Sequence, residues 1–162
     1  MKIDIKAKYP APSATVLKMF MDKDFHTKKL KALGIDKSRV LDHAAAGDDF
    51  RIKIERKVPL APPGGAVSKF LPAEATVVSE ERWNKASKTG KVKIEPAGVP
   101  VEISCTAKFA DDAGGCTITY AFDINAKIPL VGGTLEKFIA SDMQAKFADE
   151  AKAAATLLDP YR

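Results

Sequence analysis

The chain has 162 residues and a mass of 17.4 kDa, which suits a single domain over residues 1–162. Apolar residues make up 46% of it and charged residues 29%, which excludes a disordered or fibrous protein. The 26 Lys and Arg against 21 Asp and Glu residues give a net charge of +5, but the basic residues are spread over nearly every segment. We therefore expect a solvated lysine-rich surface and no nucleic-acid partner.

Targeting and metal-binding patterns are not found in the sequence. Charged residues follow Met1 at Lys2, Asp4 and Lys6, so no apolar signal-peptide segment is recognised, and no stretch has the length and apolarity of a membrane span. We expect a soluble, cytoplasmic protein with no transmembrane segment. The two cysteines and two histidines show no CxxC or HExxH spacing, and we expect neither a metal nor another cofactor.

The first third of the chain predicts one strand and two short helices. Residues 2–9 alternate apolar and charged side chains, which is the period of a half-buried strand. Apolar residues then recur at helical spacing over residues 16–20. Asp22 or Asp24 can cap a second short helix, and Gly34 ends it.

The rest of the chain predicts a sheet and one long helix. The period is two almost throughout from there to residue 128. Residues 133–158 then predict an amphipathic helix whose apolar stripe contains Leu135, Ile139, Met143, Phe147, Ala151, Ala154 and Leu158, with Phe138 beside it.

Three hairpin turns indicate which strand residues share a face. Four-residue turns at 87–90, 96–99 and 111–114 would place opposite each other Trp83 and Ile94, Ile94 and Val101, and Phe109 and Cys116. All three hairpins give one continuous apolar face, which predicts an antiparallel meander over residues 74–128. In this register Cys105 and Cys116 lie roughly 13 Å apart along the ladder, too far for a disulfide, so we expect two free, buried thiols.

The simplest packing of these elements is an α+β arrangement in which a curved antiparallel sheet wraps around the long C-terminal helix. Two short helices follow the first strand. A sheet that bends around a helix often leaves a space that side chains do not fill.

This order of elements resembles the helix-grip fold of the START-like, or SRPBCC, superfamily, which includes birch-pollen-allergen-like proteins and polyketide cyclases. The segments AKIPLVGGTLEKFIASDM (126–143), GVPVEISCTAKF (98–109) and EERWNK (80–85) are similar to an uncharacterised bacterial START-like family of unknown function. The resemblance extends over essentially the whole chain and is most specific at IPLVGGTLEK. It implies the fold and a pocket for a hydrophobic ligand, and it implies no catalytic residue.

Catalytic patterns receive little support from the residues themselves. Gly132 and Gly133 precede a helix, but IPLVGGTLEK lacks the phosphate-loop pattern, so we interpret them as a tight turn. Cys105 faces apolar residues, which should raise the pKa of its thiol and leave it inert. His43 would face inward after an even-length turn and outward after an odd one, and the sequence leaves that open.

Two charges interrupt the apolar face, and one loop is unusually long. Arg56 and Glu81 are in phase with apolar residues on their strands, so each is either a polar anchor for a ligand or a strand-end residue that reaches water. Residues 58–72 form a connection that is either a structural flap or a mobile gate.

We expect the protein to bind or carry a hydrophobic or amphipathic small molecule, lipid-like or polyketide-like, between the sheet and the C-terminal helix. The alternatives are a cyclase- or hydrolase-type enzyme that uses Arg56, Glu81 and Tyr120 as acid–base groups, and a module for peripheral membrane or protein contact. The predicted ligand-binding residues are Phe50, Ile52, Ile54, Arg56, Phe70, Val77, Glu81, Trp83, Ile94, Ile103, Cys105, Tyr120, Phe122, Phe138 and Phe147.

Overall fold

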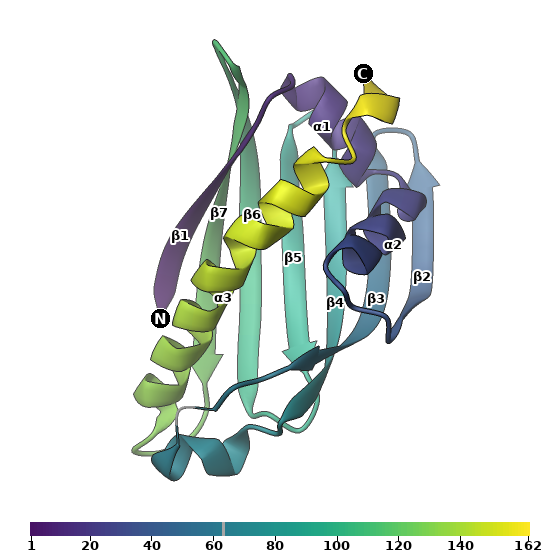
Figure 1. The fold of residues 1–162 in the computed structure, drawn as a ribbon. Helices are drawn as coiled ribbons and strands as arrows, with labels where there is room; N and C mark the ends of the chain where they lie inside the picture. Colours follow the sequence, from purple (N-terminus) through teal and green to yellow (C-terminus); the bar gives the residue numbers. More distant parts are fainter. Residues whose placement is uncertain (63) are drawn as a thin grey trace.

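The computed structural model describes residues 1–62 and 64–162; Pro63, in the predicted long loop, lies outside the described residues. In the described part of the chain, the strands form one antiparallel seven-stranded sheet in the order β1-β7-β6-β5-β4-β3-β2 (Figure 1). The strands are β1 (Lys2–Tyr9), β2 (Ser38–Ala46), β3 (Asp49–Pro59), β4 (Glu74–Asn84), β5 (Thr89–Pro96), β6 (Val101–Asp112) and β7 (Gly115–Ala126). The predicted meander is confirmed, and β1 completes the sheet by pairing with β7.

Alternation along the strands creates the inner, apolar face of the sheet. In β6 the odd-numbered side chains from Val101 to Phe109 are buried and the even-numbered ones are exposed. The same alternation recurs in β7, where Cys116, Ile118 and Tyr120 are among the buried residues. Because the side-chain period of a strand is two, each strand gives one face to the core and the other to solvent.

In residues 1–62 and 64–162, three α-helices lie on the inner face of the sheet: α1 (Ser13–Phe20), α2 (Lys23–Ala32) and α3 (Gly132–Ala155). The Asp22 side chain caps α2 by accepting a hydrogen bond from the backbone N–H of Asp24 at 3.0 Å. The start of α1 is held from β6, since Asp111 accepts hydrogen bonds from the backbone N–H and the hydroxyl of Ser13. Helix α3 ends three residues before the predicted boundary, yet Leu158 is buried as expected.

The helices cover different parts of the sheet. Helix α3 packs on β1 and β7, whereas α1 contacts β6 and β7 and α2 contacts the edge strand β2 (Figure 1). Helix α2 also contacts α3. The inner faces of β3, β4 and β5 therefore lie beneath the junction of α2 and α3, and this placement positions the candidate site.

The predicted hairpin partners are wrong, although the predicted faces are confirmed. Phe109 pairs with Ile118 rather than Cys116, Ile94 pairs with Ile103 rather than Val101, and Trp83 pairs with Gly90 rather than Ile94. Each shift is an even number of residues, so every side chain keeps its face. The β6–β7 turn is tighter than expected, because Asp112 pairs with Gly115 and only two residues lie between them. The β4–β5 turn keeps the expected four residues but lies earlier in the chain, between Asn84 and Thr89.

Gly90 explains the register of the β4–β5 hairpin. A Cβ atom at this position would collide with the six-membered ring of Trp83, which lies directly across the ladder. The indole therefore covers the glycine backbone, and no larger residue fits opposite it without moving the ring. Both cysteines are free and buried, as predicted.

The long connection after β3 contains a short 3-10 helix, η1 (Gly65–Phe70), and a second one, η2 (Asp159–Tyr161), follows α3. Val67 and Leu71 are buried, whereas Phe70 is only half-buried. The backbone N–H of Leu60 donates to the carbonyl of Ala73, which ties the two ends of this connection together.

Candidate functional site

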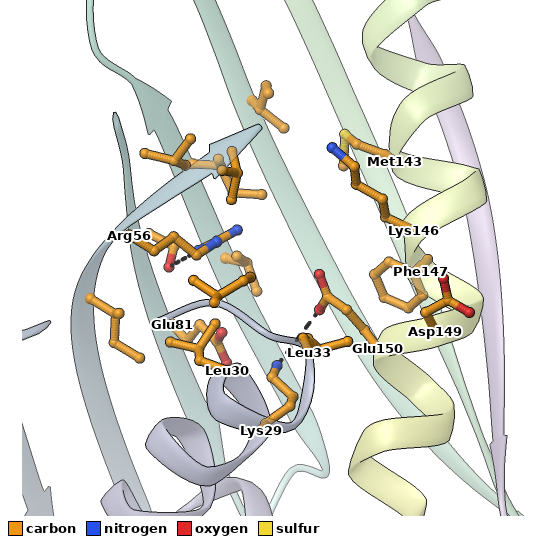
Figure 2. A pocket seen from close by; sticks show the side chains of 18 of the residues that line it. Lys29, Leu30, Leu33, Arg56, Glu81, Met143, Lys146, Phe147, Asp149 and Glu150 are labelled. Atoms are coloured by element: carbon orange, nitrogen blue, oxygen red, sulfur yellow. Dashed lines mark hydrogen bonds and ion pairs between the residues drawn. The ribbon is translucent and has the colours of Figure 1, made fainter. Parts of the chain in front are cut away.

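A cavity of about 400 Å³ lies between the inner face of β3–β5 and helices α2 and α3 (Figure 2). Its walls are mostly apolar, with Ile54, Val77, Val92, Ile94 and Ile103 from the sheet. Aromatic rings of Phe20, Trp83, Tyr120, Phe122 and Phe147 complete the lining. A volume in this range and a wall of this composition are typical of a site for a small organic molecule.

Helix α2 presents one face to this cavity. The lining residues His26, Lys29, Leu30 and Leu33 follow the spacing i, i+3, i+4 and i+7, which places them on one side of a helix. Leu30 and His26 are buried, while the Lys29 ammonium reaches the rim.

Ionic contacts connect α3 to the opposite rim. Lys29 of α2 lies 3.7 Å from Glu150 of α3, and this ion pair spans the gap between the two helices (Figure 2). Lys146 of α3 lies 2.9 Å from Asp142 and also contacts the carbonyl of Pro59 at 3.4 Å. The rim of the cavity is thus charged, and its interior is mainly apolar.

The inner faces of β3 and β4 carry polar groups that face the cavity. The successive inward residues of β4 are Val77, Ser79, Glu81 and Trp83. The Arg56 guanidinium of β3 donates a hydrogen bond to the Ser79 hydroxyl at 3.0 Å (Figure 2). The Trp83 indole N–H donates to Oε2 of Glu81 at 3.0 Å. Neither charge is left without a polar contact, which reduces the cost of placing it in an apolar wall.

His26 lies against Glu81 at the inner end of the cavity. Its ring stacks on Phe50 and is only 1% exposed. Nε2 lies 2.6 Å from the carbonyl oxygen of Phe20, and Nδ1 lies 3.9 Å from Oε2 of Glu81. A carbonyl oxygen can only accept, so Nε2 carries the hydrogen of the neutral ring.

Burial and neighbouring charges shift the pKa values of these groups. Burial lowers the pKa of His26 below its usual 6.5, although Glu81 opposes this, so the ring is neutral at pH 7. Burial alone would raise the pKa of Glu81, but His26 when it is protonated, Lys29 and the Trp83 N–H favour the carboxylate, and its pKa lies below 4.5. Burial raises the pKa of Tyr120 well above 10. At neutral pH the interior therefore holds a carboxylate, a guanidinium and a neutral imidazole.

The structure brings together ten of the residues that the sequence predicts for the site. The cavity is lined by Ile54, Arg56, Val77, Glu81, Trp83, Ile94, Ile103, Tyr120, Phe122 and Phe147. The other five lie elsewhere: Phe50 and Ile52 are packed in the core, Phe70 and Phe138 are half-buried away from the cavity, and Cys105 is buried beside it. From the long connection, Leu60 and Leu71 line the cavity in place of Phe70.

The remaining candidates for chemistry lie away from the cavity or are inert. Burial raises the pKa of Cys105 to about 12, as expected for an apolar setting. His43 pairs with Ile52 and so has the inward phase, but it is exposed because β2 is an edge strand. Gly132 begins α3 beside the carbonyl of Ala126, in keeping with a tight turn.

Tyr9 of β1 and four charged residues of α3 (Asp142, Lys146, Asp149 and Glu150) line the cavity and were not predicted. Three polar residues of α2 and β4 were also not predicted: His26, Lys29 and Ser79. The signal for the two helical residues is their spacing from Leu30 and Leu33, which places all four on one face. Ser79 is in strand phase with Val77 and Glu81, which is the pattern that identified Glu81.

In residues 1–62 and 64–162, no group of three or more His, Cys, Asp or Glu side chains is arranged to hold a metal ion. None of the helices described is both long enough and apolar enough to cross a membrane.

Comparisons with known proteins give the fold and the family. The structure is similar to TTHA0849 from Thermus thermophilus, with a TM-score of 0.66 and 18% identity over 98% of this chain and 97% of that one. It is also similar to Ara h 8.0201, with a TM-score of 0.66 and 15% identity over 98% and 97% of the two chains. Zhui aromatase/cyclase from Streptomyces sp. R1128 has a TM-score of 0.66 at 9% identity over 98% and 93%.

At these low identities the TM-scores show a shared fold, which is the predicted helix-grip fold. A search of curated proteins finds no match to the sequence. One family matches residues 4–158, nearly the whole length of the chain. The chain belongs to that family, which is described as "Protein of unknown function (DUF2505)".

Proposed function

We propose that this protein binds an amphipathic small molecule in the cavity between α2, α3 and the inner face of β3–β5. The observation that carries the proposal is an apolar cavity of about 400 Å³ whose inner wall holds a positioned carboxylate and a positioned guanidinium. Apolar walls supply affinity, and a few fixed polar groups supply orientation. The same arrangement suits a carrier or a sensor of a lipid-like or polyketide-like compound.

The apolar wall favours the hydrocarbon part of such a ligand. Burying apolar surface contributes about 25 cal/mol per Å², so a ligand that covers the sheet wall gains affinity without any specific contact. Aromatic rings from α1, β4, β7 and α3 surround the space, and Tyr120 and Phe147 form an edge-to-face pair at 4.7 Å. Flat or ring-containing skeletons complement walls of this kind.

Arg56 and Glu81 are the polar anchors in this proposal. One Arg56 nitrogen is fixed by Ser79, and the other guanidinium donors, which have no hydrogen-bond partner among the described residues, can bind a carbonyl or carboxylate oxygen of the ligand. Glu81 is fixed by Trp83 through one oxygen, and its carboxylate can accept a hydrogen bond from the ligand. The Glu81 side chain keeps 17% of its surface accessible, because it faces the cavity.

A cyclase- or hydrolase-type reaction in the same cavity is the second candidate, and the fold similarity to an aromatase/cyclase brings it forward. The protonation states support binding better. A lowered pKa makes Glu81 a weak base, and a raised pKa makes Tyr120 a weak acid at neutral pH. An acid–base catalyst with these groups would need a pKa nearer to 7.

Native mass spectrometry of the protein purified from its own host tests the proposal. We expect a small molecule to remain bound to the wild-type chain and to be lost from Val77→Phe, whose new ring fills the cavity. Val78→Phe is the matched control, because residue 78 points to the outer face of the same strand. Equal retention by both variants would contradict a cavity-bound ligand.

A further inference from the structure

Two hydrogen-bond acceptors face each other at the inner end of the cavity. Nδ1 of His26 and Oε2 of Glu81 are 3.9 Å apart, which is too far for a direct hydrogen bond. Because Nε2 donates to the Phe20 carbonyl, Nδ1 of the neutral ring has a lone pair and no hydrogen. A lone-pair nitrogen and a carboxylate oxygen therefore stand side by side with no proton between them.

This arrangement is unsatisfied within the described residues. The Nδ1 atom is buried and has no hydrogen-bond partner there, and the His26 ring is fixed in place by Phe20 and Phe50. A buried acceptor without a donor costs free energy, and an adjacent carboxylate increases that cost by repulsion. Both costs disappear when one group donates to both atoms.

We propose that His26 and Glu81 together recognise a nitrogen head group that carries at least two hydrogens, a primary amine or a primary amide of the bound molecule. This inference rests on the proposed function, since the rest of the molecule must occupy the cavity. For a nitrogen about 2.8 Å from each acceptor, the angle at that nitrogen between the directions to Nδ1 and Oε2 is roughly a right angle. This angle is close to the one between two N–H bonds of the same nitrogen.

Other head groups fit this site less well. A hydroxyl has one hydrogen and satisfies only one of the two acceptors, and a carboxylate adds a third acceptor. The charged residues that line the cavity favour a donor as well: four are acidic (Glu81, Asp142, Asp149 and Glu150) and three are basic (Lys29, Arg56 and Lys146). The free donors of Arg56 suit the carbonyl oxygen of a primary amide.

A series of probes with one skeleton separates the head group from the hydrocarbon. We would measure by isothermal titration calorimetry the affinities of 4-phenylbutylamine, 4-phenylbutanamide, 4-phenylbutan-1-ol, 4-phenylbutanoate and butylbenzene. We expect the amine, the amide or both to bind at least about tenfold more tightly than the other three, because two hydrogen bonds are added. The amine and amide arms show whether the head group is charged or neutral.

The outcomes distinguish the two proposals. If butylbenzene and the alcohol bind as tightly as both nitrogen probes, the head-group inference is wrong, while binding in the cavity stands. If no probe binds, both are contradicted. Water has the same two donors, so an amine and an amide that gain nothing over the alcohol would also mean that water alone bridges the pair.

Variants locate the effect at these two side chains. Glu81→Gln removes the charge, and His26→Gln keeps a nitrogen donor for the Phe20 carbonyl while it removes Nδ1. We expect His26→Gln to lose the preference for both nitrogen probes. We expect Glu81→Gln to lose the preference for the amine and to weaken that for the amide, because its remaining oxygen still accepts a hydrogen bond. Both variants should keep the affinity for butylbenzene. Glu80→Gln and His43→Gln are matched controls outside the cavity and should keep the preference. Preference retained by both test variants would overturn the inference.

A measurement on the wild-type chain does not depend on how the variants fold. Long-range ¹H–¹⁵N spectra of the His26 ring report whether each nitrogen carries hydrogen or accepts a hydrogen bond. We expect an Nε2–H ring with a bare Nδ1, whose nitrogen signal shifts when the tighter-binding nitrogen probe saturates the cavity. An Nδ1 signal unchanged at saturation would contradict the inference.

Discussion

The space between the sheet and its helices is filled at one end and open at the other. At the filled end Phe20 of α1 contacts Phe25 of α2, Trp83 and Phe109, and Trp83 also contacts Phe109, with ring centroids 5.0–6.0 Å apart. At the open end α3 rests on β1 and β7, and the inner faces of β3–β5 border the cavity. The two short helices therefore supply the aromatic core, and the position of α3 leaves room for a ligand.

Removing an aromatic ring from the filled end should have the largest effect on stability. Phe25 is buried, stacks on Phe20 and does not line the cavity. We expect Phe25→Ala to lower the free energy of unfolding by about 3–5 kcal/mol, measured by urea denaturation. Phe147→Ala, at the cavity wall, should cost less than half as much, because that ring is half-buried beside existing space. Equal losses would remove the distinction between the two ends.

Adding a methyl group at Gly90 tests the boundary between the two ends. The Cβ of Gly90→Ala meets the Trp83 ring, which must shift and weaken its hydrogen bond to Glu81. We expect the free energy of unfolding to fall by about 1–3 kcal/mol and the Trp83 emission spectrum to change. Gly133→Ala, where a Cβ meets no atom within 4 Å, is the control and should leave both unchanged. Unchanged emission in Gly90→Ala would contradict the close contact.

The buried histidine should make stability depend on pH. Burial lowers the pKa of His26 in the folded chain, so below about pH 6.5 the unfolded chain takes up a proton that the folded chain resists. Stability should therefore fall as the pH drops through this range, with Glu81, Lys29 and Asp22 as the charges that act on the ring. Below pH 4.5 the free energy of unfolding should decline further, because the pKa of Glu81 is lowered in the folded chain.

Chemical denaturation of the wild type and His26→Gln at several pH values measures this dependence. In His26→Gln the free energy of unfolding should no longer decline between pH 6.5 and the pH at which carboxylates begin to take up protons. The same slope in both proteins would show that His26 does not resist protonation.

The ion pair at the rim should contribute least. Lys29 and Glu150 lie 3.7 Å apart, and the Glu150 side chain is 37% exposed, so solvent screens their attraction. We expect Lys29→Met to change the free energy of unfolding by less than about 1 kcal/mol, measured by urea denaturation against Lys28→Met on the exposed face of α2. A larger loss would mean that the pair fixes α3 over the cavity.

The sequence predicts the faces of the strands better than their partners. Apolar alternation identifies the inner face of β4 to β7 because every hairpin shift is even, and this preserves the side on which each residue lies. Which residues pair depends on turn geometry and on single contacts such as that of Trp83 with Gly90. The alternating pattern of apolar residues carries no information about either. The fold could therefore be predicted without the correct register.

The candidate site is predictable where strand phase determines it. Arg56, Glu81 and Trp83 follow from alternation along β3 and β4. His26 does not, because its role depends on the position of α2 over Glu81, a tertiary contact between residues 55 positions apart in the chain. Phe70 was misplaced because residues 65–70 form a 3-10 helix rather than a periodic strand or α-helix.

Trp83 fluorescence tests binding in the cavity most directly. Trp83 is the only tryptophan, its ring lines the cavity, and its N–H is bound to Glu81, so its emission responds to a ligand at the inner wall. Titration with the five phenylbutyl probes should give a saturable change in the wild type and in Val78→Phe, and none in Val77→Phe. Emission that never changes with any probe, or that changes equally in Val77→Phe, would contradict the account.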